Sequence, residues 1–168
     1  MKKIKATEIT QNAISLIGAQ WMLVTAGTPD AYNTMTANWG GIGFLWNKPV
    51  AYIFIRPNRH TYQYIEQQEK LTLSFMGETY RQALKICGTQ SGRDIDKMKE
   101  AGLSPWITEN GNIAIADADL VIECRKLYSD MIRPENFLDS APIDTWYGED
   151  DPMHRLYIVE ITGVWARN

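Results

Sequence analysis

A series of short β-type stretches, separated by turn residues, is the feature that most constrains how this chain can fold. Six stretches are rich in β-branched and aromatic residues and are bounded by residues that favour turns. They are 21–26, 32–39, 50–56, 71–76, 119–128 and 155–165. Residues 50–55 are continuously apolar, which is typical of a strand buried on both faces.

The helical candidates between these stretches are few and short. They run from residue 58 or 59 to about 68, from 80 to 89, and from about 93 to 101, where Gly102 is placed as a C-terminal stop. A doubly wound parallel sheet would need longer helices that alternate regularly with strands. The sequence therefore predicts a mainly β fold, an antiparallel barrel that carries short helices.

A glycine-rich segment, Gly40-Gly41-x-Gly43, could be mistaken for a nucleotide-binding turn. It follows a polar strand and leads into Phe44-Leu45-Trp46, with Pro49 soon after, whereas the dinucleotide-binding fingerprint opens a helix. We predict a flexible turn or bulge at this segment.

Length and charge restrict the class of protein. A chain of 168 residues without a visible repeat or linker suits one domain, 1–168. The net charge is −3 and no basic run is longer than Lys2-Lys3, which argues against a nucleic-acid partner. A membrane-spanning helix needs roughly 20 apolar residues, far more than the longest run, 50–55. Gln20 interrupts the only stretch that resembles a signal peptide, so we expect a cytoplasmic protein.

Cysteine and histidine are too sparse for a metal centre. Cys87 and Cys124 form no Cys-x-x-Cys motif, and His60 and His154 lie far apart in the sequence without an evident ligand cluster. The sequence therefore predicts neither a disulfide framework nor a metal site.

The first candidate site is the strand Asn33-Thr34-Met35-Thr36-Ala37-Asn38-Trp39-Gly40. Strand alternation places Thr34, Thr36 and Asn38 on one face and Met35, Ala37 and Trp39 on the other. Small polar groups on one face could bind a polar heterocycle. The alternative is a half-exposed strand whose polar face meets water.

The second candidate is the turn after the apolar strand, Ile55-Arg56-Pro57-Asn58-Arg59-His60-Thr61-Tyr62. Arg56 precedes proline and should be extended, so its side chain projects at the end of the strand. Arg59, Thr61 and the N-terminus of the following helix would converge there and could bind an anion. The alternative is two solvated arginines beside a capped helix.

The third candidate runs from Cys87 to Lys97. Gly88 and Gly92 allow a ligand to approach the backbone closely, and Ser91-x-x-Asp94 resembles a helix start. Cys87 has no general base nearby, so we interpret it as a small buried thiol rather than a nucleophile. No hydrolase, kinase or P-loop motif is present, which favours chemistry supplied by a cofactor.

The three segments together resemble the flavin-reductase-like, FMN-binding split-barrel family, and in particular its flavoredoxin-like branch. The resemblance rests on Asn-x-Met-Thr-x-x-Trp-Gly, Arg-Pro-x-Arg-x-Thr and Ser-Gly-Arg-Asp-x-Asp-Lys, in that order, and is strongest over 33–102. It implies a six-stranded antiparallel split barrel that binds FMN in a groove at the interface of a homodimer.

The resemblance also implies roles for individual residues. Thr34, Met35, Thr36, Ala37 and Asn38 would hold the isoalloxazine edge, with Asn33 in the same motif and Trp39 as support. The phosphate would be held by Arg56, Arg59 and Thr61, with Lys97 adding charge near it or across the dimer. Phe75 and the segments Cys87-Gly88 and Ser91-Gly92 would close the ring or ribityl side. The acidic region 129–153 matches no motif.

Three functions remain open on this basis. The first is an oxidoreductase in which NAD(P)H reduces bound FMN by hydride transfer and the electrons pass to a partner. The second is a flavoredoxin-like electron carrier that takes electrons from a protein donor. The third is a non-catalytic flavin-binding protein.

Overall fold

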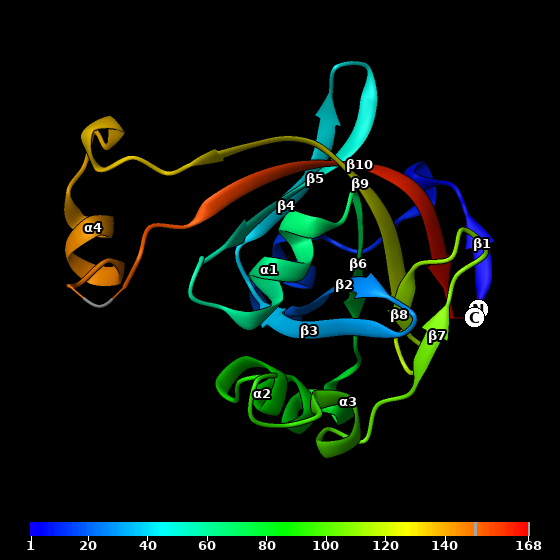
Figure 1. Cartoon of the computed structure of the whole chain (residues 1–168). Coiled ribbons are helices and arrows are strands. Elements are labelled where there is room, and N and C mark those ends of the chain that lie inside the picture. Colours follow the sequence, from blue (N-terminus) through cyan, green and yellow to red (C-terminus); the bar gives the residue numbers. More distant parts are fainter. Residues whose placement is uncertain (150, 168) are drawn as a thin grey trace.

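The computed structural model describes residues 1–149 and 151–167 and confirms a mainly β fold with an antiparallel sheet and short helices (Figure 1). The strands are β1 (Lys2–Ile4), β2 (Met22–Thr28), β3 (Ala31–Ala37), β4 (Gly40–Leu45), β5 (Lys48–Ile55), β6 (Lys70–Phe75), β7 (Pro105–Ile107), β8 (Ile113–Ile115), β9 (Leu120–Met131) and β10 (Arg155–Ala166). The helices are α1 (His60–Gln67), α2 (Arg81–Thr89), α3 (Lys97–Glu100) and α4 (Ala141–Trp146). Short helical turns cover Ala6–Glu8, Ser15–Gln20, Glu78–Tyr80 and Pro134–Asn136.

The strand order explains why the barrel is split. Hydrogen-bonded neighbours follow the order β3-β2-β6-β9-β10-β5-β4, and β1 adds to the far end of β10. β3 and β4 are consecutive in the chain, yet they lie at opposite ends of this order. The curved sheet therefore has an open seam between β3 and β4.

Two apolar clusters stabilise this arrangement. The first fills the barrel with buried side chains from the large sheet, such as Val24, Ile53 and Tyr157. The second lies between the sheet and the α2–α3 layer, where Leu84 and Met98 are buried. The α2–α3 layer is therefore held firmly against the outer side of the sheet.

The large sheet has eight strands among the described residues, two more than the six expected. The glycine segment was predicted as a turn or bulge, and that prediction was wrong, because β4 pairs with β5 along its whole length. Gly41 and Gly43 lie against the ring of Tyr52, where an added Cβ would already be in close contact at 3.4 Å. The turn instead falls at Trp46 and Asn47, whose φ angles are 52° and 58°.

The third helix is shorter than predicted. Residues 91–95 form a turn in which the amides of Asp94 and Ile95 donate to the carbonyl of Ser91. The helix begins only after Asp96, whose carboxylate accepts a hydrogen bond from the Lys99 amide. Its C-terminal stop at Gly102 is confirmed, with φ at 63°.

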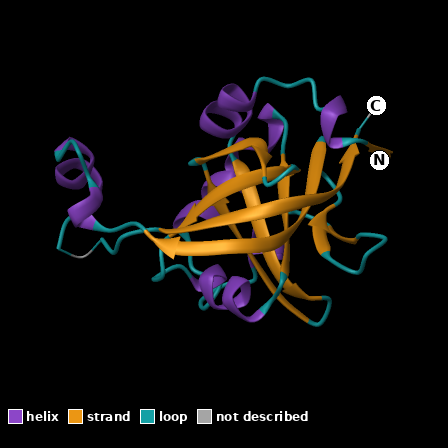
Figure 2. Ribbon diagram, turned by 90° about the horizontal axis from the view of Figure 1, so that it is seen from above, coloured by secondary structure: helices purple, strands orange, loops and turns teal. Residues whose placement is uncertain are grey.

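Residues 132–154 form an extended arm that leaves the barrel beyond β9, carries α4 and returns into β10 (Figures 1 and 2). None of the described residues from 132 to 153 is buried. In the part of the chain that the structure describes, no helix is long and apolar enough to cross a membrane.

Candidate functional site

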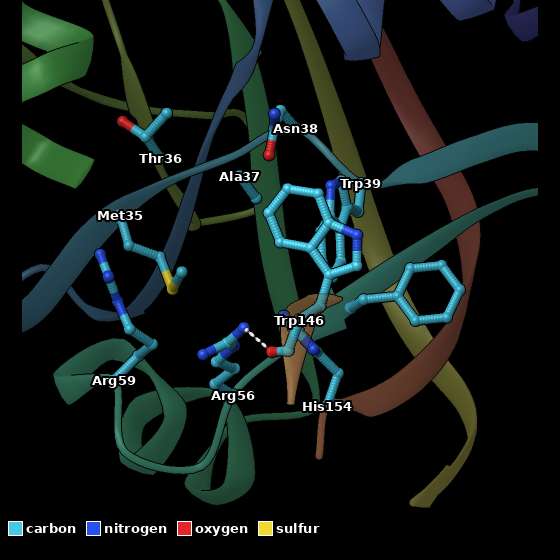
Figure 3. Close-up of a pocket in the computed structure, with 10 residues that line it drawn as sticks. Met35, Thr36, Ala37, Asn38, Trp39, Arg56, Arg59, Trp146 and His154 are labelled. Carbon is cyan, nitrogen blue, oxygen red and sulfur yellow. Dashed lines mark hydrogen bonds between the residues drawn. The ribbon is translucent and has the colours of Figure 1, made fainter. Parts of the chain in front are cut away.

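A cleft opens at the seam of the barrel and brings together the first two sequence motifs and the arm (Figure 3). One wall comes from the end of β3 and the link to β4, a second from the end of β5, and a third from the arm. Its lining residues are Met35, Thr36, Ala37, Asn38, Trp39, Phe54, Arg56, Arg59, Trp146 and His154.

The alternation predicted for β3 is present, but its threonine hydroxyls do not face an open cleft. Met35 and Ala37 are buried in the barrel core. Thr34 is buried on the opposite face, where its hydroxyl bonds with that of Thr25, and the Thr36 hydroxyl donates to the carbonyl of Leu84 in α2. The α2–α3 layer covers this face, and the hydroxyls of Thr34 and Thr36 are satisfied by β2 and α2. β3 therefore offers the cleft mainly its backbone and the exposed Asn38.

A second hollow, which we call the basic pocket, lies beside this cleft at the start of α1. It is lined by Asn58, Arg59, His60, Thr89, Gln90, Ser91, Arg93 and Lys97. Arg59 lines both the cleft and the basic pocket, so the two hollows adjoin.

Two cations of the basic pocket are held by backbone carbonyls at the end of α2. The Lys97 ammonium donates to the carbonyls of Cys87 (2.8 Å) and Thr34 (3.0 Å), and the Arg59 guanidinium donates to the carbonyl of Gly88 (2.6 Å). Among the described residues, neither cation has a carboxylate within ion-pair distance.

Burial makes these positive charges costly. Burial first, and then the charge of Arg59, lowers the pKa of Lys97 to about 8, while Cys87 acts in the opposite direction. The pKa of Arg59 is lowered by burial and by Arg56. Cations that are desolvated in this way, without a counter-charge, favour an anionic ligand.

We expected the glycines of the third motif to let a ligand approach the backbone, but in the structure the space beside them is occupied by side chains of β3. A Cβ on Gly92 would overlap the side-chain amide of Asn33, with its Cγ at 2.8 Å, and a Cβ on Gly88 would lie 3.3 Å from the Cβ of Thr36. The Asn33 amide donates to the buried hydroxyl of Thr61 over 2.7 Å. Thr61 therefore positions β3 against α1, and the hydroxyl that we expected at an anion is completely buried.

Arg56 departs most from its expected role at a phosphate. Its guanidinium donates to the carbonyl of Trp146 over 2.7 Å (Figure 3). It also forms an ion pair with Asp151 and lies 5.7 Å from the ring centroid of Tyr147. All three contacts are to the arm, whose acidic sequence supplies the carboxylate. Arg56 thus connects the arm to β5, and Arg59 and Lys97 are the better candidates for binding an anion.

Replacing Arg56 with alanine should release the arm without changing the preference between phosphorylated and unphosphorylated ligands. The substitution removes the ion pair and the hydrogen bond that join the arm to β5. Limited proteolysis should show faster cleavage within 132–154 than in the wild type. If cleavage were unchanged, Arg56 would not be holding the arm.

Two further predicted residues lie in the core rather than in the cleft. Phe75 is 1% exposed and packs inside the barrel. Cys87 is completely buried, and burial raises the pKa of its thiol to about 11, which agrees with an inert thiol. Phe75 can support the site only through packing, whereas Cys87 also supplies the carbonyl that accepts from Lys97.

Three residues of the cleft were missed by the sequence reasoning, namely Phe54, Trp146 and His154. The indole of Trp146 packs edge-on against Trp39 at 5.2 Å, and His154 lies 4.8 Å from the same ring. Burial, and then the charge of Arg56, lowers the pKa of His154 to about 4, so this imidazole is neutral at pH 7. Arm residues bear no recognisable spacing to the other motifs, so no sequence pattern pointed to them.

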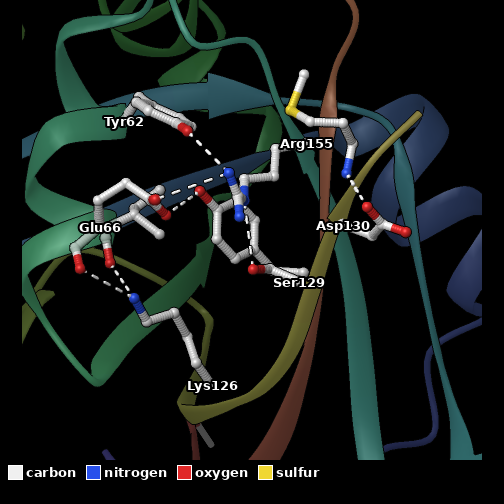
Figure 4. Close-up of polar contacts among 9 residues, drawn as sticks. Tyr62, Glu66, Lys126, Ser129, Asp130 and Arg155 are labelled. Carbon is white, nitrogen blue, oxygen red and sulfur yellow. Dashed lines mark hydrogen bonds and ion pairs between the residues drawn. The ribbon is translucent and has the colours of Figure 1, made fainter. Parts of the chain in front are cut away.

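The helix that opens the basic pocket is fixed from its other side (Figure 4). Glu66 of α1 accepts a hydrogen bond from the Tyr157 hydroxyl (2.7 Å), and the Tyr62 hydroxyl accepts one from Arg155 (3.4 Å). The Lys126 ammonium donates to the carbonyls of Ile65 and Glu66. These contacts with β9 and β10 set the position of the N-terminus of α1 at the basic pocket.

A metal centre finds no support in the described residues, since no group of three or more histidine, cysteine or acidic side chains could hold an ion. The arrangement is instead a backbone-lined aromatic cleft next to a basic pocket. Such a site suits a planar ligand that carries an anionic group.

Comparison with known proteins gives a consistent result. The chain resembles an FMN-binding protein from Thermus thermophilus (TM-score 0.69, 18% identity, covering 100% of this chain and 83% of that one). It also resembles the flavoredoxin of Desulfovibrio vulgaris (Miyazaki F) (0.68, 21%, 100% and 78%) and a Streptomyces globisporus NADH:FAD oxidoreductase (0.64, 16%, 88% and 75%). No curated protein matches the sequence. The family model of the flavin reductase like domain matches residues 14–168, and the chain therefore belongs to this family.

Proposed function

We propose that this protein binds FMN and acts as an oxidoreductase in which NAD(P)H reduces the bound flavin. The observation that carries the proposal is the pair of cations Arg59 and Lys97, which have no carboxylate partner among the described residues and lie beside the cleft. Bound FMN would supply the redox chemistry by accepting a hydride from the nicotinamide. The family membership and the FMN-binding structural neighbours support this choice of cofactor.

The residues present fit the two ends of FMN. The phosphate would lie in the basic pocket, where the guanidinium of Arg59 and the ammonium of Lys97 can donate charge-assisted hydrogen bonds. Asn58 and Ser91 line the same pocket. The ring would lie in the cleft against the backbone of 35–38, with Trp39 beside it.

The protein would contribute orientation and exclusion of water. The β3 backbone can hydrogen-bond to the polar edge of the ring and stabilise negative charge on the reduced flavin. Phe54, Trp39 and Trp146 give the cleft an apolar rim, and His154 is neutral there. None of these groups needs to act as an acid or a nucleophile.

The protein incubated with FMN should retain it through gel filtration and show a resolved flavin spectrum. NADH or NADPH alone should then bleach the bound flavin anaerobically. Equilibrium dialysis at micromolar protein that detects no FMN retention would overturn the cofactor assignment.

A flavoredoxin-like electron carrier is the second candidate, and the flavoredoxin among the structural neighbours favours it. It would keep FMN bound but would not be bleached by either nicotinamide nucleotide. Reduction by dithionite with no reduction by NADH or NADPH would select this function over the first.

We also expect a homodimer in which part of each flavin site comes from the partner. None of the described arm residues from 132 to 153 is buried in this chain, and Leu138 and Trp146 on the arm are exposed. A helix as short as α4 has little stability by itself, so a second copy would be needed to cover it. Light scattering on the FMN-bound protein should give twice the mass of one chain, and the mass of one chain would refute the expectation.

A further inference from the structure

Lys97 lies at the meeting point of β3, α2 and the basic pocket. Its ammonium donates to Thr34 in β3 and to Cys87 in α2, and the residue is 5% exposed. An ammonium has three N–H donors, and these two bonds use two of them. The third is available to a ligand in the basic pocket, which Lys97 lines.

The charged groups around Lys97 make the protonation of its ammonium depend on the ligand in the basic pocket. Arg59 and His60 face it from α1, Cys87 from α2, and Arg93, Asp94 and Asp96 belong to the turn before α3. The charge of Arg59 disfavours the protonated form of Lys97. A bound anion would reverse that balance and favour the protonated ammonium.

We propose that Lys97 is a positioning residue that joins the two halves of the flavin site, because its ammonium ties the ring-binding strand β3 to the phosphate-binding end of α2. This inference rests on the proposed binding of FMN. Phosphate in the basic pocket stabilises the charged ammonium, and the charged ammonium in turn holds the backbone that receives the ring.

The position of β3 in the sheet explains why its hydrogen bond with Lys97 is important for the position of the strand. β3 is an edge strand that pairs only with β2 in the described sheet, and its other edge faces the seam. Thr34, whose carbonyl Lys97 holds, directly precedes the cleft residues 35–38. Loss of the charged donor should therefore loosen the segment that binds the ring.

Flavin titrations at pH 7 on Lys97→Met test this role against that of a simple phosphate ligand. The variant should weaken riboflavin about tenfold and FMN by more than that, since a charge-assisted bond is lost from both parts of the site. Arg59→Ala should weaken FMN alone, and Lys99→Met, an exposed lysine on the same helix, should change neither ligand. Riboflavin binding that is unchanged in Lys97→Met would overturn the positioning role.

Hydrogen–deuterium exchange without any flavin separates this inference from the proposed function. Amides of β3 should exchange faster in Lys97→Met than in Lys99→Met. Faster exchange of the β3 amides in Lys97→Met, together with no flavin binding by the wild type, would support the positioning role of Lys97 and refute the FMN proposal. Unchanged exchange of these amides would refute the positioning role, whichever ligand binds.

Wild-type protein provides the same test without a substitution. Because the pKa of Lys97 is lowered to about 8, the free protein loses this proton as the pH rises through that value, whereas bound phosphate retains it. FMN affinity should therefore fall between pH 7 and pH 9, and Lys97→Met should abolish that fall. An equal pH dependence in the variant would contradict the inference.

Discussion

Replacing Arg59 with alanine should weaken FMN binding between about tenfold and more than a hundredfold and leave riboflavin binding almost unchanged. A hydrogen bond to a charged partner contributes roughly 1.5–3 kcal/mol, which corresponds to that range of affinity. Riboflavin has the same ring and ribityl chain but lacks the phosphate. Arg59 lines the basic pocket and has no carboxylate partner among the described residues, so its loss should remove a phosphate contact together with its hydrogen bond to the carbonyl of Gly88.

Paired fluorescence titrations at fixed ionic strength would measure the effect. Arg133→Ala is a suitable control, since this guanidinium is exposed on the arm and, among the described residues, forms an ion pair only with Asp130. If Arg59→Ala weakened both flavins equally, the side chain would be supporting the ring pocket or the fold, and the phosphate assignment would be wrong.

Replacing Gly92 with alanine should have the complementary effect and weaken both flavins together. The new Cβ would overlap the buried amide of Asn33, which cannot move freely while it donates to Thr61. Overpacking at a well-packed position typically costs about 1–3 kcal/mol. Part of that cost should appear as lower stability and part as a displaced β3, so the ratio of FMN to riboflavin affinity should stay near that of the wild type.

Chemical denaturation and the same two titrations would test this expectation. Gly148→Ala is the matched control, because a Cβ at that position meets no atom within 4 Å. A Gly92→Ala protein with unchanged stability and unchanged riboflavin affinity would show that Asn33 can rearrange and that its contact with Thr61 is dispensable.

Much of the fold could be predicted because long strands carry a strong local signal. The apolar run at 50–55 and the alternation at 32–39 correspond to β5 and β3. β4 was missed because glycine has little intrinsic preference for strands, and its place is set by the ring of Tyr52 on the neighbouring strand. The three-residue strands, such as β7 and β8, are too short to show a period in the sequence.

The sequence motifs pointed to residues that the structure brings together around the cleft and the basic pocket. They did not predict which contacts each of these residues makes. Arg56 and Arg59 look equivalent beside Pro57, yet one contacts the arm and the other the end of α2. The difference depends on Asp151, which lies 95 positions away from Arg56 and had no recognised motif. Partners brought together only by the tertiary fold leave no local pattern in the sequence.

The arm has a consequence for how proteins of this architecture can diversify. Its described residues from 132 to 153 fill no part of either apolar cluster, and its contacts with the cleft run through Arg56 and Trp39. Insertions, deletions and exchanges of sequence there would leave the free energy of folding of the barrel nearly intact. The arm is therefore a segment that can be exchanged, so that one wall of the cleft can change while the barrel stays the same.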